Sequence, residues 1–584
     1  MAHPSAVRSW WPALANPRIA WGLVALGAIA FSLYPTGLFR QDILNPGGLP
    51  QLGQFLAASL QPDFSPEFLA LALNAAIITL AYAVCGTVFS IALGLIGGVW
   101  VSEVWWKTVF PQRGGRVRAG IRFLLAIPRA IHELIWGLFF INIFGLDPLV
   151  AILAIAIPYG AIVAKVFSEI LDETPRQPLL ALLSSGVAPL TAFTYSLIPQ
   201  AGLNLLSYTF YRFECSIRSA AVLGIIGAGG LGYEILLSLQ SLRYNQLWTL
   251  FYALFLLNGL VDLSSAWVRR RLGSPSRLDL NFRKLSHRAE SQAAAQITPA
   301  AFSLHSESDQ RVKLDPILLL AGVAIVLLIP FCFNFVQADF SKLWSARTFE
   351  LLVDIGQSAL PPRFEVEQWQ QLLGLSLQTL AMSILAIALA GFGGILLSFP
   401  AAYNFFLPGG LLATVGQSRG GRILAWVSLL LTRSLLLIAR AIPAPIWALV
   451  ALFVLFPGML PGAIALSIHN LGILGRLMAE VNENLDQRPL IALKSLGAPG
   501  PLVFLYGVLP LTFTRFLAYT LYRWEVCMRE TVIVGLVGAG GLGRLLTEQL
   551  TSFDYRSVIV TLGCFVVLTF VVDWVSGTAR RSLR

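Results

Sequence analysis

Apolar segments long enough to cross a membrane recur along the whole chain and restrict it to one class of fold. A run of about 18 or more apolar residues spans a bilayer as a helix. We count twelve runs, near residues 19–36, 69–101, 120–143, 149–170, 191–213, 247–268, 315–336, 369–399, 423–442, 462–480, 502–525 and 557–575. Only 12% of the residues are charged, against roughly 25% in soluble domains. The sequence predicts an all-α polytopic membrane protein of about 12 helices.

The second half of the chain repeats the first. A shift of 311 residues aligns Tyr208–Gly232 with Tyr519–Gly543 without a gap, and 13 of the 25 positions are identical. Such self-similarity marks duplicated structural units. We therefore expect two tandem six-helix transmembrane domains, residues 1–268 and 315–584, joined by a linker at 269–314.

The placement of charge predicts how the chain is oriented. The linker carries nine basic and four acidic residues, and basic loops are held on the cytoplasmic side of a membrane. The loop between the second and third runs carries Lys107, Arg113, Arg116 and Arg118. Both termini are then cytoplasmic, and the protein lies in the inner (plasma) membrane. This pattern accounts for the net charge of +11 without a nucleic-acid partner.

Neither a metal site nor a disulfide framework is expected. The five cysteines lie in or beside apolar runs and form no C-x-x-C pair. His132 and Glu133 lack the second histidine of H-E-x-x-H. Lys165 with Glu169, and Arg476 with Glu480, are four residues apart and are interpreted as structural ion pairs.

A short apolar stretch recurs between the fourth and fifth runs of each half. It reads PLLALLSSG up to Gly186 and PLIALKSLG up to Gly497, and a proline follows each glycine after thirteen residues. On the cytoplasmic side such a stretch is poorly buried unless a partner covers it. We interpret both stretches as docking sites whose marker residues are Ala181, Gly186, Pro199, Ala492, Gly497 and Pro510.

This spacing resembles the EAA loop of ABC importer permeases, the coupling helix that sits in a groove of the ATP-hydrolysing subunit. Arg-Ala-Ile-Pro from Arg440, Leu-Tyr-Arg-Trp-Glu, Arg529, Val-Gly-Ala-Gly-Gly-Leu-Gly and Asp573 together resemble the phosphonate-type importer permease. That family also serves related reduced phosphorus oxyanions. The first half carries the same set from Arg129 to Asp262. The resemblance implies two tandem type I ABC importer (MetI-like) domains in one chain.

The sequence departs from the family pattern in two places. The glutamate expected six residues before the loop glycine is replaced by Leu180 and by Ile491. The pattern Arg-x-Ile-Pro-Glu is split between the halves, since one half has His132-Glu133 where the other has Pro443-Ala444. We therefore expect the two halves to contribute unequally to the pathway.

Charged residues recur inside the fifth run of each half. A charge at the centre of a membrane helix costs roughly 2.5 to 3.5 kcal/mol on insertion scales, so these residues should face the interior, and Glu214 can pair with Arg218 four residues on. The forked donors of arginine match phosphate and phosphonate oxygens. The predicted translocation pathway consists of Arg129, Arg212, Glu214, Arg218, Arg440, Arg523, Glu525 and Arg529. The alternative, that these groups only hold helices together, stays open.

A glycine-rich segment follows the fifth run in each half. Its G-x-G-x-x-G spacing is no dinucleotide fingerprint, because no strand precedes it. Closely spaced glycines allow sharp turns and close backbone approach, and plain helix packing is the alternative to a gate. We interpret the segment as an outer gate formed by Gly227, Gly229, Gly230, Gly232, Gly538, Gly540, Gly541 and Gly543.

These observations predict the permease subunit of an ATP-driven importer for phosphonate or a related oxyanion (phosphite, hypophosphite, phosphate). The chain has no G-x-x-x-x-G-K-[ST] phosphate loop, so it is not expected to be an enzyme or to hold a cofactor. ATP and Mg are expected to be used by two partner ATPase copies. The resemblance adds an extracytoplasmic solute-binding protein, which holds the high-affinity site.

Three alternatives remain. The chain could be an importer permease for another small solute such as an amino acid, or a stand-alone secondary transporter or channel. A membrane-embedded enzyme is the least supported, because the recurring charged positions include no nucleophile or metal set.

Overall fold

The first half of the chain folds into helices only, as far as the structure describes it. A computed structural model describes residues 17–36, 43–110, 114–272, 316–362, 366–407, 419–486 and 488–583. The elements of the first half are α2 (Pro17–Leu33), η1 (Pro46–Gly48), α3 (Leu49–Ala58), α4 (Pro66–Val101), α5 (Glu103–Val109), α6 (Gly114–Ala130), α7 (Glu133–Phe144), α8 (Pro148–Glu173), α9 (Gln177–Ser184), α10 (Pro189–Ala192), η2 (Phe193–Leu197), α11 (Ile198–Leu223), η3 (Gly224–Ala228), α12 (Leu231–Gln240) and α13 (Tyr244–Arg271).

The second half repeats this order. Its elements are α15 (Pro316–Val336), η4 (Phe340–Trp344), α16 (Ala346–Ser358), α17 (Val366–Ala401), α18 (Tyr403–Phe406), α19 (Arg419–Ala441), α20 (Ala444–Val454), α21 (Met459–Glu483), α22 (Arg488–Ser495), α23 (Gly500–Val503), η6 (Phe504–Val508), α24 (Leu509–Val534), η7 (Gly535–Ala539), α25 (Gly541–Thr551) and α26 (Tyr555–Leu583). Of the predicted linker, only residues 269–272 lie within the described part.

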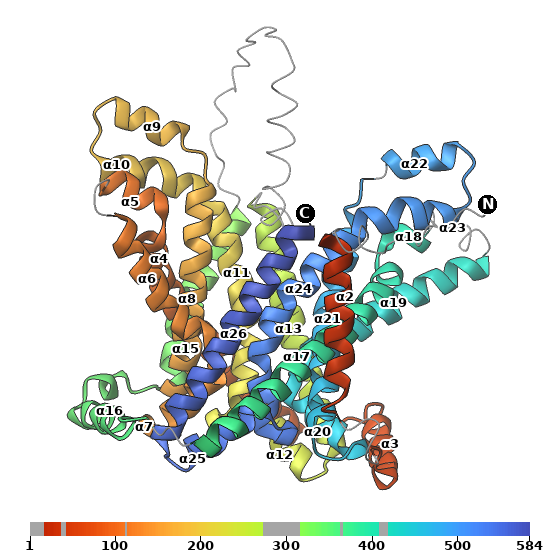
Figure 1. Cartoon of the computed structure of the whole chain (residues 1–584), viewed down its shortest axis with the longest axis horizontal. Coiled ribbons are helices and arrows are strands. Elements are labelled where there is room, and N and C mark those ends of the chain that lie inside the picture. Colours follow the sequence, from red (N-terminus) through yellow and green to blue (C-terminus); the bar gives the residue numbers. More distant parts are fainter. Residues whose placement is uncertain are drawn as a thin grey trace, which may run out of the picture.

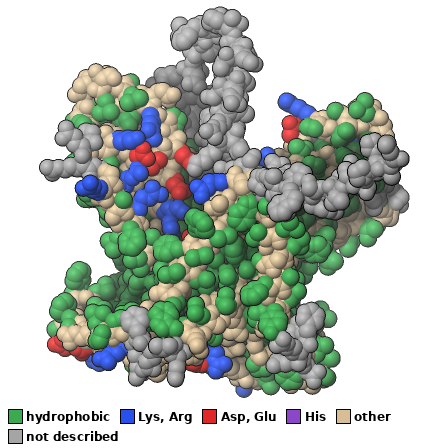
Figure 2. All heavy atoms as spheres, viewed as in Figure 1, with side chains coloured by type: hydrophobic (Ala, Val, Ile, Leu, Met, Phe, Trp, Pro, Cys, Tyr) green, Lys and Arg blue, Asp and Glu red, His purple; other side chains and the backbone are tan. Residues whose placement is uncertain are grey.

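Helices long and apolar enough to cross a bilayer account for most of the described chain. Eight single helices qualify, and two bent pairs raise the number to as many as ten. The opening helices α2 and α15 are also apolar but shorter, so the predicted twelve spans require both of them to cross as well. Figure 2 shows hydrophobic side chains over the middle of the visible face, with charged side chains gathered mainly nearer the end that carries α9.

The long helices run between two ends of one bundle (Figure 1). The short helices α9 and α22 project from one end, which we name the α9/α22 end, and they lie apart from each other. The α12/α25 end is opposite and also carries α3 and α16. The described chain begins with α2 and finishes with α26 at the α9/α22 end.

The third apolar run of each half is broken rather than continuous, which corrects the predicted single helix at 120–143. The axes of α6 and α7 differ by 84° across Ile131 and His132. His132 is extended, and its Nδ1 accepts a hydrogen bond from Leu134 N at 3.2 Å, which caps α7. Pro443 has almost the same backbone angles before α20. An imidazole in one half and a proline in the other thus start the same new helix.

The first helix of each half packs against the other half. In the second half, α17 and α26 both pack against α2. In the first half, α4 and α13 both pack against α15, where Phe333 meets Phe89 at a ring distance of 5.6 Å. This exchange ties the two domains together along their outer walls.

Glycines let the two main helices of the first half pack closely. Along α4, Gly86, Gly94 and Gly98 face α8, and a Cβ built on Gly94 would lie 2.2 Å from Cγ1 of Val163. Small residues at such crossings allow backbones to approach, which is how helices associate in a membrane without a hydrophobic driving force. The α4–α8 pair therefore depends on the absence of side chains at these positions.

Gly94→Val should separate α4 from α8, because Val163 leaves no room for the added atoms. We expect it to destabilise the detergent-solubilised chain by about 1–3 kcal/mol, the usual cost of overpacking, measured as a lower thermal midpoint. Gly259→Val is the matched control, since nothing lies within 4 Å of a Cβ at that position on α13. Equal midpoints for the two variants would contradict the close packing.

Candidate functional site

Two short helices expose apolar side chains at the α9/α22 end. Leu179 of α9 and Leu490 of α22 are fully buried and anchor each helix to its own half. The next residue in each helix, Leu180 and Ile491, is more than half exposed, and Leu496 is 84% exposed. Ala181 and Ala492 are exposed on the same helices. The structure thus places both predicted docking stretches on projecting surfaces.

A glycine ends each of these helices. Gly186 and Gly497 have φ of +80° and +82°, the left-handed conformation that glycine adopts without strain. Their N–H groups donate to the carbonyls of Leu183 (3.1 Å) and Lys494 (2.9 Å). This is the usual helix ending with glycine just past the last turn.

The prolines that follow shape the next long helix. Pro199 and Pro510 lie in the first turn of α11 and of α24, directly after the π-helical segments η2 and η6. Because proline lacks an N–H and its ring displaces the carbonyl four residues before it, one wider turn accommodates it. Both prolines therefore form the bend that leads from the projecting helix back into the bundle.

The recurring glutamates tie the fifth helix of each half to the last one. Glu214 Oε1 accepts hydrogen bonds from Ser265 (2.6 Å) and from Arg269 of α13 (3.4 Å). The same arrangement recurs in the second half, where Arg580 of α26 lies 2.6 Å from Glu525. The expected pairing of Glu214 with Arg218 is not formed, and Arg218 donates instead to Cys215 Sγ at 3.3 Å. These glutamates support the walls of the bundle.

Ion pairs between the halves, among the described residues, include Lys342 of η4 with Asp147 just before α8 and Arg440 with Asp262. Arg440 at the end of α19 donates to Asp262 of α13 at 2.8 Å. The repeat counterparts Arg129 and Asp573 interact electrostatically but form no ion pair within the described residues. Arg129 is approached by a second arginine, because Arg529 donates to its backbone carbonyl at 3.4 Å. The ion pair of Arg440 with Asp262 therefore has no equivalent between Arg129 and Asp573 within the described residues.

A second pair of repeat positions shows the same asymmetry. Arg476 of α21 donates to Glu480 at 2.8 Å, as the spacing predicts. No such bond joins Lys165 to Glu169 among the described residues, and Lys165 is exposed. It lies within electrostatic range of Arg129 and Asp573. Cations from both halves therefore gather near Arg129 and Asp573.

Deeper in the bundle lies a polar layer built from both halves. Arg523 donates from Nε to Asn470 (2.5 Å) and from Nη2 to Glu530 (2.6 Å). His132 of the first half and His469 of the second both lie within electrostatic range of Glu530. The break between α6 and α7 therefore brings a first-half side chain close to a second-half carboxylate.

The first half contributes a different set of groups to this layer. Ser219 donates to Glu133 at 2.6 Å, and its hydroxyl also bonds with the hydroxyl of Tyr159. The guanidinium of Arg212 lies 3.9 Å over the Tyr159 ring. His132 Nε2 is 3.2 Å from Glu133. Arg212 and Glu133 are both present, but within the described residues they form no ion pair, unlike Arg523 and Glu530.

An apolar contact closes the interface toward the α12/α25 end. Leu134, Val222 and Ile533 form a small buried cluster drawn from both halves. Val222 and Ile533 are repeat counterparts and lie one turn beyond Ser219 and Glu530. The glycine turns follow directly, with positive φ at the first three glycines of each predicted gate. Aliphatic side chains of the two halves therefore pack together at this level.

The glycine turns start the short helices α12 and α25, which fold back beside the long ones. The axes change by 57° in the first half. Thr79 accepts from Leu231 N (2.8 Å) and Thr379 from Leu542 N (2.9 Å), so each turn is pinned. A Cβ on Gly232 would lie 1.8 Å from the carbonyl oxygen of Ala221, which explains why only glycine fits there.

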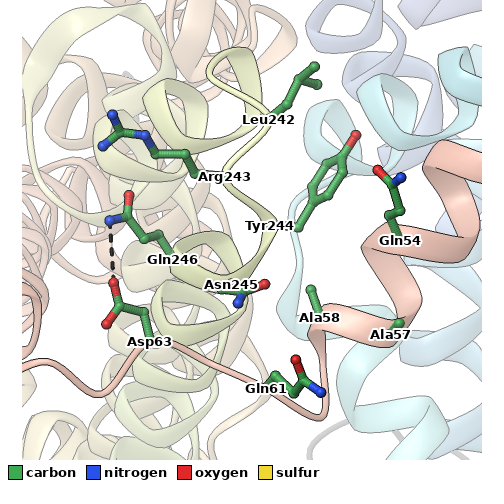
Figure 3. A pocket seen from close by; sticks show the side chains of 10 residues that line it. All are labelled: Gln54, Ala57, Ala58, Gln61, Asp63, Leu242, Arg243, Tyr244, Asn245 and Gln246. Atoms are coloured by element: carbon green, nitrogen blue, oxygen red, sulfur yellow. Dashed lines mark hydrogen bonds between the residues drawn. The ribbon is translucent and has the colours of Figure 1, made fainter.

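A surface cavity of about 530 Å³ opens between α3 and the turn that leads into α13. Figure 3 shows Asp63 accepting from Gln246 at 3.3 Å, with Arg243 and Asn245 nearby. It lies at the α12/α25 end, away from the polar layer. Within the described ranges, no group of three His, Cys, Asp or Glu residues could hold a metal ion.

Sequence reasoning missed the partners that differentiate the two halves. The shift of 311 residues pairs Ser219 with Glu530 and Tyr159 with Asn470. The alignment of the two halves already showed that a serine in one copy replaces a glutamate in the other. Such a difference within an apolar helix could have indicated unequal roles. Leu134 gave no such signal, because its importance arises only from the break before α7.

Comparison with known proteins identifies relatives of both halves. The family described as "Binding-protein-dependent transport system inner membrane component" matches twice, at residues 94–274 and 408–584. The phosphate-import permease protein PhnE of Mycolicibacterium smegmatis is 27% identical over 515 residues, 87% of this chain and 85% of that protein. The phosphite transport system permease protein PtxC of Stutzerimonas stutzeri is 28% identical over 45% of this chain and 90% of its own length.

A solved structure gives a weaker match. One chain of the MetNI methionine ABC transporter, in an inward-facing conformation, is 21% identical and superposes with a TM-score of 0.32. The superposition covers 36% of this chain and 99% of that chain.

Asp262→Asn should loosen the contact between the halves, because it removes the carboxylate that binds Arg440. We expect a loss on the order of 1 kcal/mol for this partly exposed pair, measured as a lower thermal midpoint. Asp573→Asn is the matched control, since Asp573 forms no ion pair within the described residues, and its midpoint should stay at the wild-type value. An equal loss in both variants would contradict the difference between these two repeat positions.

Proposed function

Because the chain belongs to the family of binding-protein-dependent transport system inner membrane components, we propose that it imports phosphonate or a related phosphorus oxyanion (phosphite, hypophosphite or phosphate). The chain carries both permease domains of the importer. The observation that carries the choice of solute is the set of arginines that recur at the interface and in the polar layer beneath it. Relatives named as phosphate and phosphite permeases support the same solute class.

The electrostatics of the pathway fit a small anion. Arg129, Arg218, Arg440 and Arg529 come from both halves, and a cationic lumen lowers the barrier for an anion. Arginine also offers paired donors to phosphorus oxygens. The proposed pathway residues are Arg129, Arg212, Glu214, Arg218, Arg440, Arg523, Glu525 and Arg529. Within that set, Glu214 and Glu525 act by holding α13 and α26 in place.

The energy for transport comes from partner ATPases, since the family works as the membrane part of a larger system. We assign one ATPase copy to α9 and one to α22, where exposed leucine and isoleucine side chains lack cover. These partners bind ATP and Mg, and no nucleic acid is involved. A solute-binding protein docks at the α12/α25 end and delivers the oxyanion.

The proposed transport cycle follows from this arrangement. Closure of the ATPases moves α9 and α22 together, and the halves rock as rigid bodies around the polar layer. The contact of Leu134, Val222 and Ile533 then opens, and the pinned glycine turns, Gly227 to Gly232 and Gly538 to Gly543, act as the hinges of the outer gate.

The topology in this proposal follows the positive-inside rule. Residues 1–268 and 315–584 form the two domains, and the linker 269–314 is cytoplasmic. The α9/α22 end, where α2 begins and α26 finishes, faces the cytoplasm. Both termini are then cytoplasmic in a multi-pass protein of the inner membrane.

The solute class is tested with the complete system in proteoliposomes, with ATP inside and binding protein outside. We expect uptake of radiolabelled inorganic phosphate or methylphosphonate that needs both ATP and the binding protein. Phosphite should compete, whereas an amino acid should not. Uptake driven by an ion gradient alone would favour a secondary transporter, and competition by amino acids only would favour another importer class.

The coupling surfaces are tested by Ala181→Arg combined with Ala492→Arg. Both side chains are exposed, so the chain should reach the membrane with a wild-type thermal midpoint. Uptake should fall at least about tenfold, and the binding protein should no longer stimulate ATP hydrolysis, because a desolvated charge opposes docking. Ala181→Ser with Ala492→Ser is the control and should retain uptake. Normal uptake by the arginine variant would refute the assignment of α9 and α22.

A further inference from the structure

Two buried arginines at matching repeat positions have opposite surroundings. Arg523 uses Nε and Nη2 to bind Asn470 and Glu530. Its counterpart Arg212 is only 7% exposed. Its Nε and Nη2 are both buried, and within the described residues neither has a hydrogen-bond acceptor. The two nitrogens that are satisfied in the second half are therefore vacant in the first.

The vacancy follows from two substitutions between the copies. Where the second half has Asn470, the first has Tyr159, whose ring stacks on the face of the guanidinium and supplies no acceptor to its edge. Where the second half has Glu530, the first has Ser219, whose hydroxyl is directed to Glu133 at 2.6 Å. Both acceptors that fill the edge of Arg523 are thus absent from the edge of Arg212.

Glu133 is a carboxylate of the same polar layer, and it is held by other groups. Its Oε1 accepts from Ser219, and its Oε2 lies 3.2 Å from His132. It forms no ion pair with Arg212 within the described residues. The first half therefore also contains a carboxylate in this layer, Glu133, but Ser219 and His132 hold it and it does not pair with Arg212 within the described residues.

A buried guanidinium without a carboxylate is costly, because arginine cannot lose its proton to escape the burial and charges at membrane depth are expensive. Stacking on Tyr159 compensates part of that cost. The remaining donors form a fork that fits two oxygens of a carboxylate, phosphate or phosphonate. In the second half the Asn470 amide oxygen and the Glu530 carboxylate occupy that fork, so these two acceptors show how two oxygens of an oxyanion would sit on Arg212.

The site also lies where a transported solute must pass. Arg212 is in the middle of α11, fourteen positions after Ile198 and eleven positions before Leu223. Its guanidinium stacks on Tyr159, and the Tyr159 hydroxyl reaches Ser219. Val222, one turn beyond Ser219, belongs to the apolar contact between the halves. The vacant fork is therefore on the α9/α22 side of that contact, next to the interface.

We propose that the fork of Arg212 binds one tetrahedral phosphorus oxyanion during its passage. The permease has this site in the first half only, because Asn470 and Glu530 occupy the equivalent fork of Arg523. The inference rests on the proposed function and adds a location and a stoichiometry of one anion per chain. The fused permease is thus asymmetric at its centre: one arginine binds the solute while its counterpart holds α24 against α21.

Ser219→Glu combined with Glu133→Ala tests this directly, because it gives the first half the residues that the second half has at Glu530 and Ala444. That arrangement is already compatible with folding in the second half. With inorganic phosphate as the probe in the complete reconstituted system, we expect the phosphate moved per ATP hydrolysed to fall at least about tenfold, since the new carboxylate occupies the fork. ATP hydrolysis stimulated by the binding protein should stay within about twofold of wild type.

Arg212→Gln should give the same result by removing the donors. Arg433→Gln with Glu483→Gln is the matched control, because it removes another arginine–glutamate pair, between α19 and α21, outside the polar layer. That control should keep phosphate per ATP within about twofold of wild type. The ratio separates the two roles, since a merely structural arginine would lower uptake and ATP hydrolysis together.

A wild-type ratio in both Arg212→Gln and the Ser219→Glu, Glu133→Ala variant would overturn the inference. So would an equal drop in the Arg433→Gln, Glu483→Gln control, because the loss would then follow from removing an arginine elsewhere in the bundle. A wild-type system that moves no phosphorus oxyanion would contradict the proposed function instead, which keeps the two failures distinct.

Discussion

The rest of this structure depends on one constraint, the cost of a charge in an apolar bundle. Each charged group at membrane depth must form an ion pair, stack on an aromatic ring or serve the transport function, because burying a charge without compensation costs free energy. Glu214 with Arg269, at 3.4 Å, and Glu525 with Arg580, at 2.6 Å, are pairs at matching positions of the two halves. Such repeated pairs define the common frame of the two domains, since they fix the last long helix against the fifth.

Departures from the repeat occur at the interface and in the polar layer, not in that frame. The ion pair of Arg440 with Asp262 has no equivalent on the other side within the described residues. Arg476 forms an ion pair with Glu480, whereas in the described part of the chain no ion pair joins Lys165 to Glu169. A duplicated chain allows this difference, because a substitution in one copy changes one side of the pathway and leaves the other side intact. Two identical chains would change both sides together.

The sequence predicted the elements better than it predicted their partners. Apolar runs and the 311-residue shift place nearly every long helix, because burial in lipid requires such runs. Hydrophobicity did not reveal the break at His132, since apolar residues continue on both sides of it. Local spacing also misled for Glu214, which faces Arg218 on the helix but binds α13 instead. Partners 178 residues apart, such as Arg440 and Asp262, leave no trace in local spacing.

The position of one carboxylate per half decides what each buried arginine can do. In the second half the carboxylate stands on the same helix as its arginine, seven residues on, and closes on it at 2.6 Å. In the first half it stands on α7, behind Ser219, where a serine and a histidine hold it. Both halves therefore contain one arginine and one carboxylate in this layer, and only their connection differs. The first half has its carboxylate, Glu133, at the start of α7, whereas the second half has Glu530 on α24. Arg212 therefore lacks the ion pair that Arg523 forms within the described residues, although each half contributes one arginine and one carboxylate to the layer. The same difference appears in the sequence as the split of the Arg-x-Ile-Pro-Glu pattern, since Glu133 of the first half corresponds to Ala444 of the second.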